Sequence, residues 1–156
     1  MNPTTLAGLV KRAYPNFKME FFDNRLKLQK LIYLMQASKL NLGYNFKLYL
    51  HGPYCTVLAR EGFDMPTFDN CKRIAFEEPE HEKQFEFFLN FISNKKDLKE
   101  DMEILASLHL FHKMNIKAGD DEVIEFVKNK NPIFKDKEKK IKSLLHELKG
   151  SGVIEW

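Results

Sequence analysis

The sequence predicts a mainly α-helical protein, a compact domain of about six to seven helices with one small antiparallel β-ribbon and a winged-helix-like C-terminal part. Apolar residues recur at helical spacing through most of the chain, whereas the alternation typical of a half-buried strand occurs over one short stretch. The chain has 156 residues, of which 44% are hydrophobic and 30% charged. These values predict a single globular domain over residues 1–156, long enough to bury a core.

Two helices are predicted in the first quarter of the chain. Pro3 suits the first position of a helix, and the Tyr14-Pro15 pair ends that helix. A second helix is predicted over Asp23–Lys39, with Asp23 or Asn24 as its cap and Gly43 beyond its end. The spacing of apolar residues predicts its inward face to be Leu28, Leu31, Ile32, Leu34 and Met35.

The β-ribbon is predicted from residues 44–51, where apolar and polar side chains alternate. Gly52-Pro53 is expected to break this strand, and Pro53 to begin a short helix that Gly62 stops. Arg73–Phe76 is predicted as the second strand, paired with residues 45–50.

The second half of the chain is predicted to form four further helices. They begin at Pro79, cover Leu98–Met114, run from Asp120 to Asn131, and cover Asp136–Lys149. The last helix has a clean apolar face and is followed by Gly150, the residue expected just beyond a helix end. Val153–Trp156 is predicted to be a closing strand or an extended tail.

Composition narrows the cellular setting. The apolar runs are far shorter than a membrane span, and the N-terminus lacks the pattern of a secretory signal, so no membrane association is expected. Cys55 and Cys71 form neither a CxxC motif nor a disulfide framework. These features predict a cytoplasmic protein.

The net charge of +3 is unevenly distributed. Residues 128–149 carry eight lysines against three acids, while residues 61–103 carry twelve acids against six bases. A basic amphipathic helix followed by a glycine turn is typical of a winged-helix unit, so a DNA-binding transcription regulator is the alternative hypothesis. A solvated helix face is the other interpretation. The candidate phosphate contacts are Lys137, Lys139, Lys140 and Lys142.

No motif for a particular enzyme reaction occurs in the chain. His109 and His112, with Glu100 and Glu103 upstream, do not make a zinc motif, and no glycine-rich phosphate loop occurs. Cys55 lies four residues after His51, which leaves a cysteine hydrolase as a third hypothesis. We therefore predict a non-enzymatic protein with no metal site and no cofactor.

One set of polar and aromatic residues is a candidate site. These residues belong to the second helix, the strand and the turn after it, where they form either a buried lock or a surface for a protein partner. The set is Gln29, Lys30, Tyr33, Tyr49, His51, Gly52, Pro53 and Tyr54.

The phrases LQKLIYL (Leu28–Leu34) and HGPY (His51–Tyr54), with a strand between them, resemble the Panacea-domain family. That family includes SocA-like antitoxins and GepA-like phage-associated proteins. The resemblance is dense over Arg25–Leu58, whereas residues 61–103 align only loosely. Tyr54-Cys55 depart from the family's usual pattern, in which aliphatic residues often follow Gly-Pro.

The resemblance implies a bare helical module that acts by direct contact with a protein partner. It implies an antitoxin-like neutraliser or adaptor in a toxin–antitoxin or phage-defence system, with a toxin encoded nearby as the partner. Its oligomeric state does not follow from the sequence. Since one fold can carry different binding surfaces, the family alone does not give the function.

Overall fold

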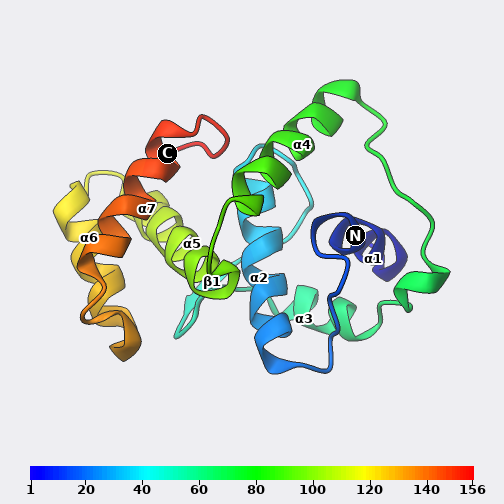
Figure 1. Ribbon diagram of the computed structural model, residues 1–156, viewed down its shortest axis with the longest axis horizontal. Helices are drawn as coiled ribbons and strands as arrows, with labels where there is room; N and C mark the ends of the chain where they lie inside the picture. The colour runs from blue at the N-terminus through cyan, green and yellow to red at the C-terminus, as the bar shows by residue number, and fades with distance from the viewer.

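Helix α5 (Leu98–Met114) lies between helix α2 (Phe22–Ala37) and the pair formed by α6 (Asp120–Lys130) and α7 (Glu138–Gly150), as Figure 1 shows. A computed structural model describes all residues from 1 to 156. Ten consecutive residues of α5, Asp101–Leu110, are buried, so this helix is covered on every side. The structure has seven α-helices and one two-stranded antiparallel sheet, which confirms the predicted mainly α fold.

Helix α2 (Phe22–Ala37) packs against α5 and is buried almost as completely. All eight residues of Leu28–Met35 are buried, not only those of the predicted apolar face. The reason is that α2 contacts α5 on one side, and strand β2 (Gly52–Tyr54) and helix α3 (Thr56–Phe63) on another. A helix enclosed in this way buries polar side chains together with apolar ones.

The predicted caps of this helix are wrong. The N-cap residue is Phe21, whose side chain makes no capping hydrogen bond. Asp23 pairs with Lys99, at 2.7 Å between Lys99 Nζ and Asp23 Oδ1. The amide of Asn24 donates to the Lys18 carbonyl at 3.0 Å, which ties the helix start to the preceding loop.

The sheet is a hairpin of β1 (Lys47–Tyr49) and β2 (Gly52–Tyr54), in which Lys47 faces Tyr54. Gly52-Pro53 therefore begins the second strand of the sheet and does not begin a helix. The chain reverses at this point because Gly52 adopts a φ of +87° directly after the turn. The prediction that Arg73–Phe76 is the second strand is wrong. This segment has no regular structure, and its Ile74 packs against Gly8 of α1 (Pro3–Ala13).

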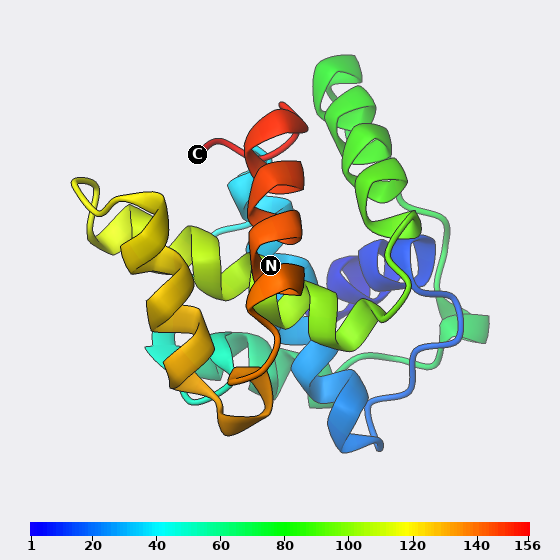
Figure 2. The same cartoon turned by 60° about the vertical axis from the view of Figure 1, so that its left-hand side comes forward.

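Helices α1 and α4 (Pro79–Ser93) begin at the predicted prolines. Helix α4 stands at the edge of the molecule, away from α6, in Figure 1 and Figure 2. Arg12 of α1 links this helix to α4, because it forms an ion pair with Glu82. It also donates to the Ile74 carbonyl at 3.0 Å. Its guanidinium also lies 4.5 Å from the centre of the Phe85 ring.

The C-terminal part consists of α6 (Asp120–Lys130), a 3₁₀ turn (Pro132–Phe134), α7 (Glu138–Gly150) and a tail. A second 3₁₀ turn, Phe68–Asn70, follows α3. Helix α7 buries the predicted face of Ile141, Leu144, Leu145 and Leu148. Residues 151–156 form neither the predicted strand nor an extended tail, because residues 151–154 are a succession of bends. The strand that a winged-helix unit needs after this helix is therefore missing.

The tail closes the fold by contacting two other helices. The Glu155 amide donates to the carbonyl of Ala37 at the end of α2, at 3.3 Å. The indole of Trp156 stacks on the His112 ring of α5 with 4.2 Å between ring centres. The left-handed glycine beyond α7 is Gly152, with a φ of +65°, and not the predicted Gly150.

The attachment of α4 can be measured with a matched pair of substitutions. Phe85 is 0% exposed and Phe87, on the same helix, is 50% exposed. We expect Phe85→Ala to lower the free energy of unfolding by about 3–5 kcal/mol, because it leaves a cavity in the core. Phe87→Ala should change it by less than about 0.5 kcal/mol in the same urea titration. Equal effects of the two substitutions would contradict this packing.

Candidate functional site

Gln29 on α2 holds the backbone of Cys55, where β2 leads into α3. Its Nε2 donates to the Cys55 carbonyl at 3.1 Å, and its Oε1 accepts from the Cys55 amide at 2.8 Å. Both groups are buried. A single amide side chain thus satisfies both backbone groups of the residue before α3, which fixes that helix against α2.

Lys30, the next residue, is 2% exposed and donates from Nζ to the Pro53 carbonyl at 2.8 Å. Burial lowers the pKa of Lys30 to about 7, the nearby Glu103 carboxylate opposes this shift, and Lys130 adds to it. Taking an ammonium group out of water is costly, so the neutral amine is favoured inside the protein. The bond joins the hairpin to α2.

Gly52 allows the hairpin to approach the central helix closely. A Cβ atom at this position would lie 2.7 Å from Ser107 Oγ on α5 and 3.3 Å from Lys30 Cε. The positive φ of Gly52 is also one that residues with side chains rarely adopt. The glycine is thus required both by the backbone conformation and by the space available.

Tyr33 completes the contact between α2 and α5. Its hydroxyl lies 2.7 Å from His109 Nδ1, and His109 Nε2 lies 2.8 Å from the Glu155 carbonyl of the tail. Burial raises the pKa of Tyr33, and burial lowers the pKa of His109 to about 4. Both groups are therefore neutral at pH 7, and they connect three segments that are distant in sequence.

Glu103 on α5 is a buried carboxylate below the hairpin turn. It accepts from Asn131 Nδ2 at 3.1 Å and lies 3.6 Å from His51 Nδ1. Lys130 donates to the Leu50 carbonyl in the turn itself. Sequence reasoning considered Glu103 only as a metal ligand and Asn131 only as a helix end. The sequence feature that could have indicated a buried Glu103 is its position directly before the mostly apolar stretch Ile104–Leu110.

The predicted polar set therefore separates into two groups. Gln29, Lys30, Tyr33, Gly52 and Pro53 form a buried lock, which we call the hairpin lock. The remaining members, Tyr49, His51 and Tyr54, lie further out: Tyr49 is exposed and packs on Tyr54, with 5.3 Å between ring centres.

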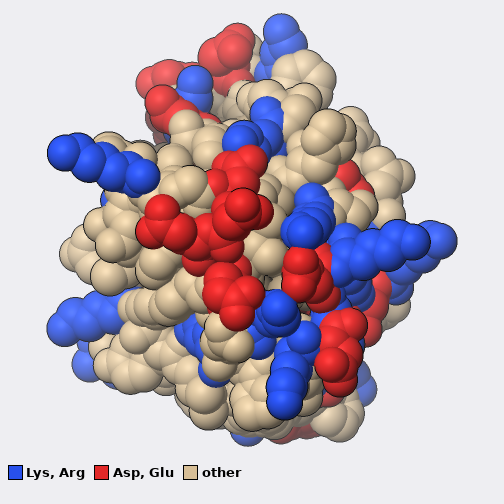
Figure 3. Space-filling model, turned by 90° about the vertical axis from the view of Figure 1, so that its left-hand side faces the viewer, with Lys and Arg blue, Asp and Glu red and all other residues tan.

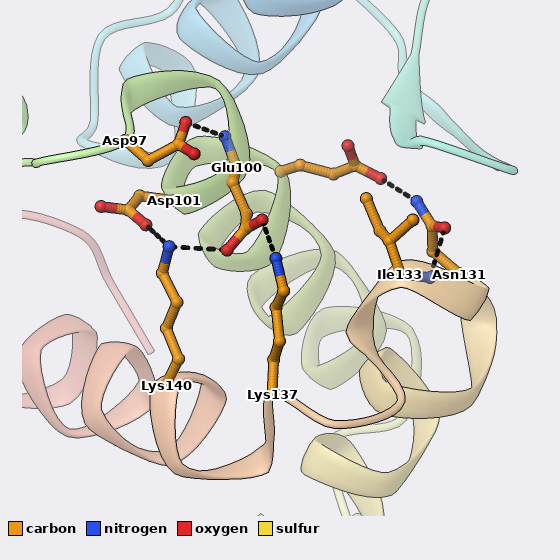
Figure 4. A network of polar contacts seen from close by, with 8 residues as sticks. Asp97, Glu100, Asp101, Asn131, Ile133, Lys137 and Lys140 are labelled. Atoms are coloured by element: carbon orange, nitrogen blue, oxygen red, sulfur yellow. Dashed lines mark hydrogen bonds and ion pairs between the residues drawn. The ribbon is translucent and has the colours of Figure 1, made fainter.

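The candidate phosphate-binding lysines lie on α7 and its start, and three of them form ion pairs within the chain. Lys137 and Lys140 both reach Glu100 on α5, as Figure 4 shows, and Lys140 Nζ also lies 2.7 Å from Asp101 Oδ1. Although burial opposes it, these two lysines hold the pKa of Glu100 below its usual value. Lys142 pairs with Glu138.

Lys139 is the one candidate of the four that forms no ion pair. Figure 3 shows the face that carries α6 and α7, where carboxylates lie among the lysines instead of leaving one continuous basic surface. Phosphate binding would have to compete with these internal partners. The arrangement therefore gives little support to DNA binding through α7.

The residues considered for enzyme chemistry lie apart. Cys55 is buried and forms no hydrogen bond through its thiol, while His51 is next to Glu103. His109 and His112 have separate partners, the Tyr33 hydroxyl and the Trp156 ring. No group of three histidine, cysteine or acidic side chains has the arrangement of a metal site.

No family model, no curated protein and no solved structure matches this chain. The resemblance to the Panacea-domain family therefore stays a prediction that rests on residues 25–58. None of the helices combines the length and apolarity that crossing a membrane requires. What the structure adds is the geometry of the hairpin lock and of the surface beside it.

The close approach at Gly52 can be tested against Gly43, which also has a positive φ, +80°, but has open space around it. Alanine at either position adopts an unfavourable backbone conformation. Only Gly52→Ala also clashes with Ser107, and we expect it to destabilise the protein by about 1–3 kcal/mol more than Gly43→Ala. Urea unfolding followed by circular dichroism measures both. Equal losses would show that the hairpin has room to move away from α5.

The buried amine of Lys30 should make stability depend on pH. Between its folded pKa of about 7 and its ordinary value of 10.5, the unfolded chain binds a proton at Lys30 that the folded chain does not. The free energy of unfolding should thus rise with pH from 7 to 9, by up to about 1.4 kcal/mol per pH unit. Above pH 10, Tyr33 and Tyr44 act in the opposite direction, because burial raises both pKa values.

Lys30→Met keeps an unbranched side chain as far as Cε and removes the titrating amine. We expect its stability to vary less between pH 7 and pH 9 than that of the wild type, in urea titrations at constant ionic strength. An identical slope for both proteins would mean that Lys30 stays protonated in the folded state.

Proposed function

We propose that this chain is a non-enzymatic protein-interaction module, an antitoxin-like neutraliser or adaptor that acts in the cytoplasm by direct contact with a protein partner. The resemblance of residues 25–58 to the Panacea-domain family is one support. The observation that carries the proposal is how this segment divides its side chains. Its polar groups are used internally, while its outer face presents exposed apolar groups.

The polar side chains of this segment form defined hydrogen bonds within the protein. The Gln29 amide and the Lys30 amine bind backbone groups of the protein itself, at 2.8–3.1 Å, and are buried. Such groups hold a framework in place and have few bonds left for a ligand. The family-like motif thus acts as a support for the surface around it, which fits a module whose work is done by its shape.

The external face supports a role in protein contact. Leu50 within the segment, and Phe22 three residues before it, are both more than half exposed. Scattered exposed apolar residues are normal on soluble proteins, but neighbouring ones mark interaction sites. The DNA-binding alternative has no comparable support, since Lys137, Lys140 and Lys142 have carboxylate partners in the chain.

The proposal is tested by expressing the product of the adjacent gene alone and together with this chain. We expect the neighbour to arrest growth alone, co-expression to restore growth, and the two proteins to co-elute in size-exclusion chromatography. Cys55→Ser should neutralise as well as the wild type, because the proposal requires no chemistry at the thiol.

Two results would contradict the proposal. One is a neighbouring product that is harmless alone and does not bind this chain at micromolar concentration. The other is loss of neutralisation in Cys55→Ser with the complex intact, which would favour the cysteine hydrolase. Binding of duplex DNA at low salt that weakens in Lys139→Glu would favour the transcription regulator instead.

A further inference from the structure

A row of exposed and half-buried side chains crosses three elements beside the hairpin lock. We call it the aromatic strip, and it consists of Leu50, His51, Phe22, Arg25 and Phe63. The rings of Phe22 and His51 meet edge to face with 6.4 Å between centres. The Arg25 guanidinium lies 5.5 Å from the Phe22 ring and 5.8 Å from the Phe63 ring. The row thus runs from the hairpin turn across the start of α2 to the end of α3.

The apolar members of the strip are largely open to solvent. Leu50 is 63% exposed, Phe22 57% and Phe63 64%. Phe63 also borders a groove of about 490 Å³ between residues 15–20 and 62–69. Other apolar walls of this groove are Phe17, Met65 and Phe68. A partner side chain that follows the strip past Phe63 therefore has an apolar place to enter.

Two cations, Arg25 in the strip and Lys130 next to Leu50, form no ion pair. Arg25 donates from Nη1 to the Met19 and Glu20 carbonyls, at 3.2 and 2.8 Å, and forms no ion pair. Lys130 donates to the Leu50 carbonyl at the other end and forms none either. Exposed carboxylates occur nearby in the sequence at Glu20 and Asp64, but neither pairs with these cations.

We propose that the aromatic strip and its groove bind a segment of a partner protein that combines large apolar side chains with carboxylates. The inference rests on the proposed function, because it names the surface and the chemistry of the partner. Arg25 is held by two backbone bonds and two rings, so it loses little freedom when its remaining N–H groups bind a carboxylate. Aromatic residues and arginine are also the side chains that most often dominate binding energy at interfaces.

Two other occupants fit less well. If a second copy bound about a two-fold axis through Arg25, near the middle of the strip, the two Arg25 side chains would meet, and like charges would repel. A single-stranded nucleic acid would stack on the phenylalanines, but its backbone needs a continuous positive groove. The groove here has Lys18 against Glu20 and Asp69. A peptide needs only isolated carboxylates, placed at Arg25 and Lys130.

The probe is a phage-displayed library of random dodecapeptides, selected on the purified chain. We expect enriched peptides to combine Trp, Phe or Leu with Asp or Glu. In fluorescence anisotropy with one enriched peptide, Phe22→Ser and Phe63→Ser should each raise Kd at least tenfold. Phe87→Ser is the matched control, since Phe87 is exposed to a similar degree on α4, and its Kd should stay within twofold.

Arg25→Gln tests the charge, but it also removes bonds that support the start of α2. A double-mutant cycle separates these effects. The wild type and Arg25→Gln are each measured with the peptide and with a peptide in which the Asp or Glu is replaced by Asn or Gln. We expect the loss caused by Arg25→Gln to shrink when the peptide carboxylate is already an amide. Equal losses with both peptides would overturn the assignment of Arg25 to a carboxylate.

Four results would overturn the surface itself: no enriched peptide, enrichment of basic peptides, equal weakening by Phe87→Ser, or tighter binding of a 12-nucleotide oligo(dT) or oligo(U). A dimer in sedimentation that Phe22→Ser dissociates would assign the strip to a second copy instead. If a Phe22→Ser, Phe63→Ser double variant binds the neighbouring product normally, the strip is wrong and the proposed function stands. If peptides bind at the strip but the neighbouring product does not bind this chain at all, the proposed function is wrong and the assignment of the strip as a peptide-binding surface stands.

Discussion

The burial of α5 on every side is the constraint on which the rest of the structure depends. A helix in this position hides Asp101, Glu103, Ser107 and His109 among its apolar residues, and buried polar groups without partners are costly. Neighbouring elements supply partners for three of the four. Helix α7 pairs Lys140 with Asp101, Asn131 after α6 binds Glu103, and Tyr33 of α2 binds His109. The Ser107 hydroxyl has no hydrogen-bond partner, and Gly52 of the hairpin leaves room for it.

The same constraint explains why the family-like motif contributes framework more than surface. Gln29 and Lys30 face inward because α2 is enclosed between α5, the hairpin and α3. Their bonds to Cys55 and Pro53 hold the hairpin in one place. The turn of that hairpin is thereby positioned beside the first residues of α2. A rigid support of this kind presents an exposed surface at little cost in conformational entropy.

Part of the candidate site was predictable from sequence and part was not. The pairing of Gln29 and Lys30 with the Gly-Pro turn follows from polar residues on an otherwise apolar helix. The strand partner was misassigned to Arg73–Phe76, because a strand of three residues carries too little alternation to be distinguished from a turn. The exposure of Phe63 could not be predicted from the sequence, because exposure at the end of a helix depends on which residues the following chain covers.

The sequence by itself determined the helical class, the start of α1 and α4 at prolines and the buried face of α7, because periodicity and backbone chemistry act locally. It also determined which polar residues were available for a lock. Only the tertiary structure decided that Lys137 and Lys140 meet carboxylates of α5, and that Phe22, Arg25 and Phe63 come together. The contacts of Lys137 and Lys140 with α5, and of Arg25 with Phe63, join residues far apart in the chain. Their geometry is set by the packing of whole helices, α7 on α5 and α3 on α2.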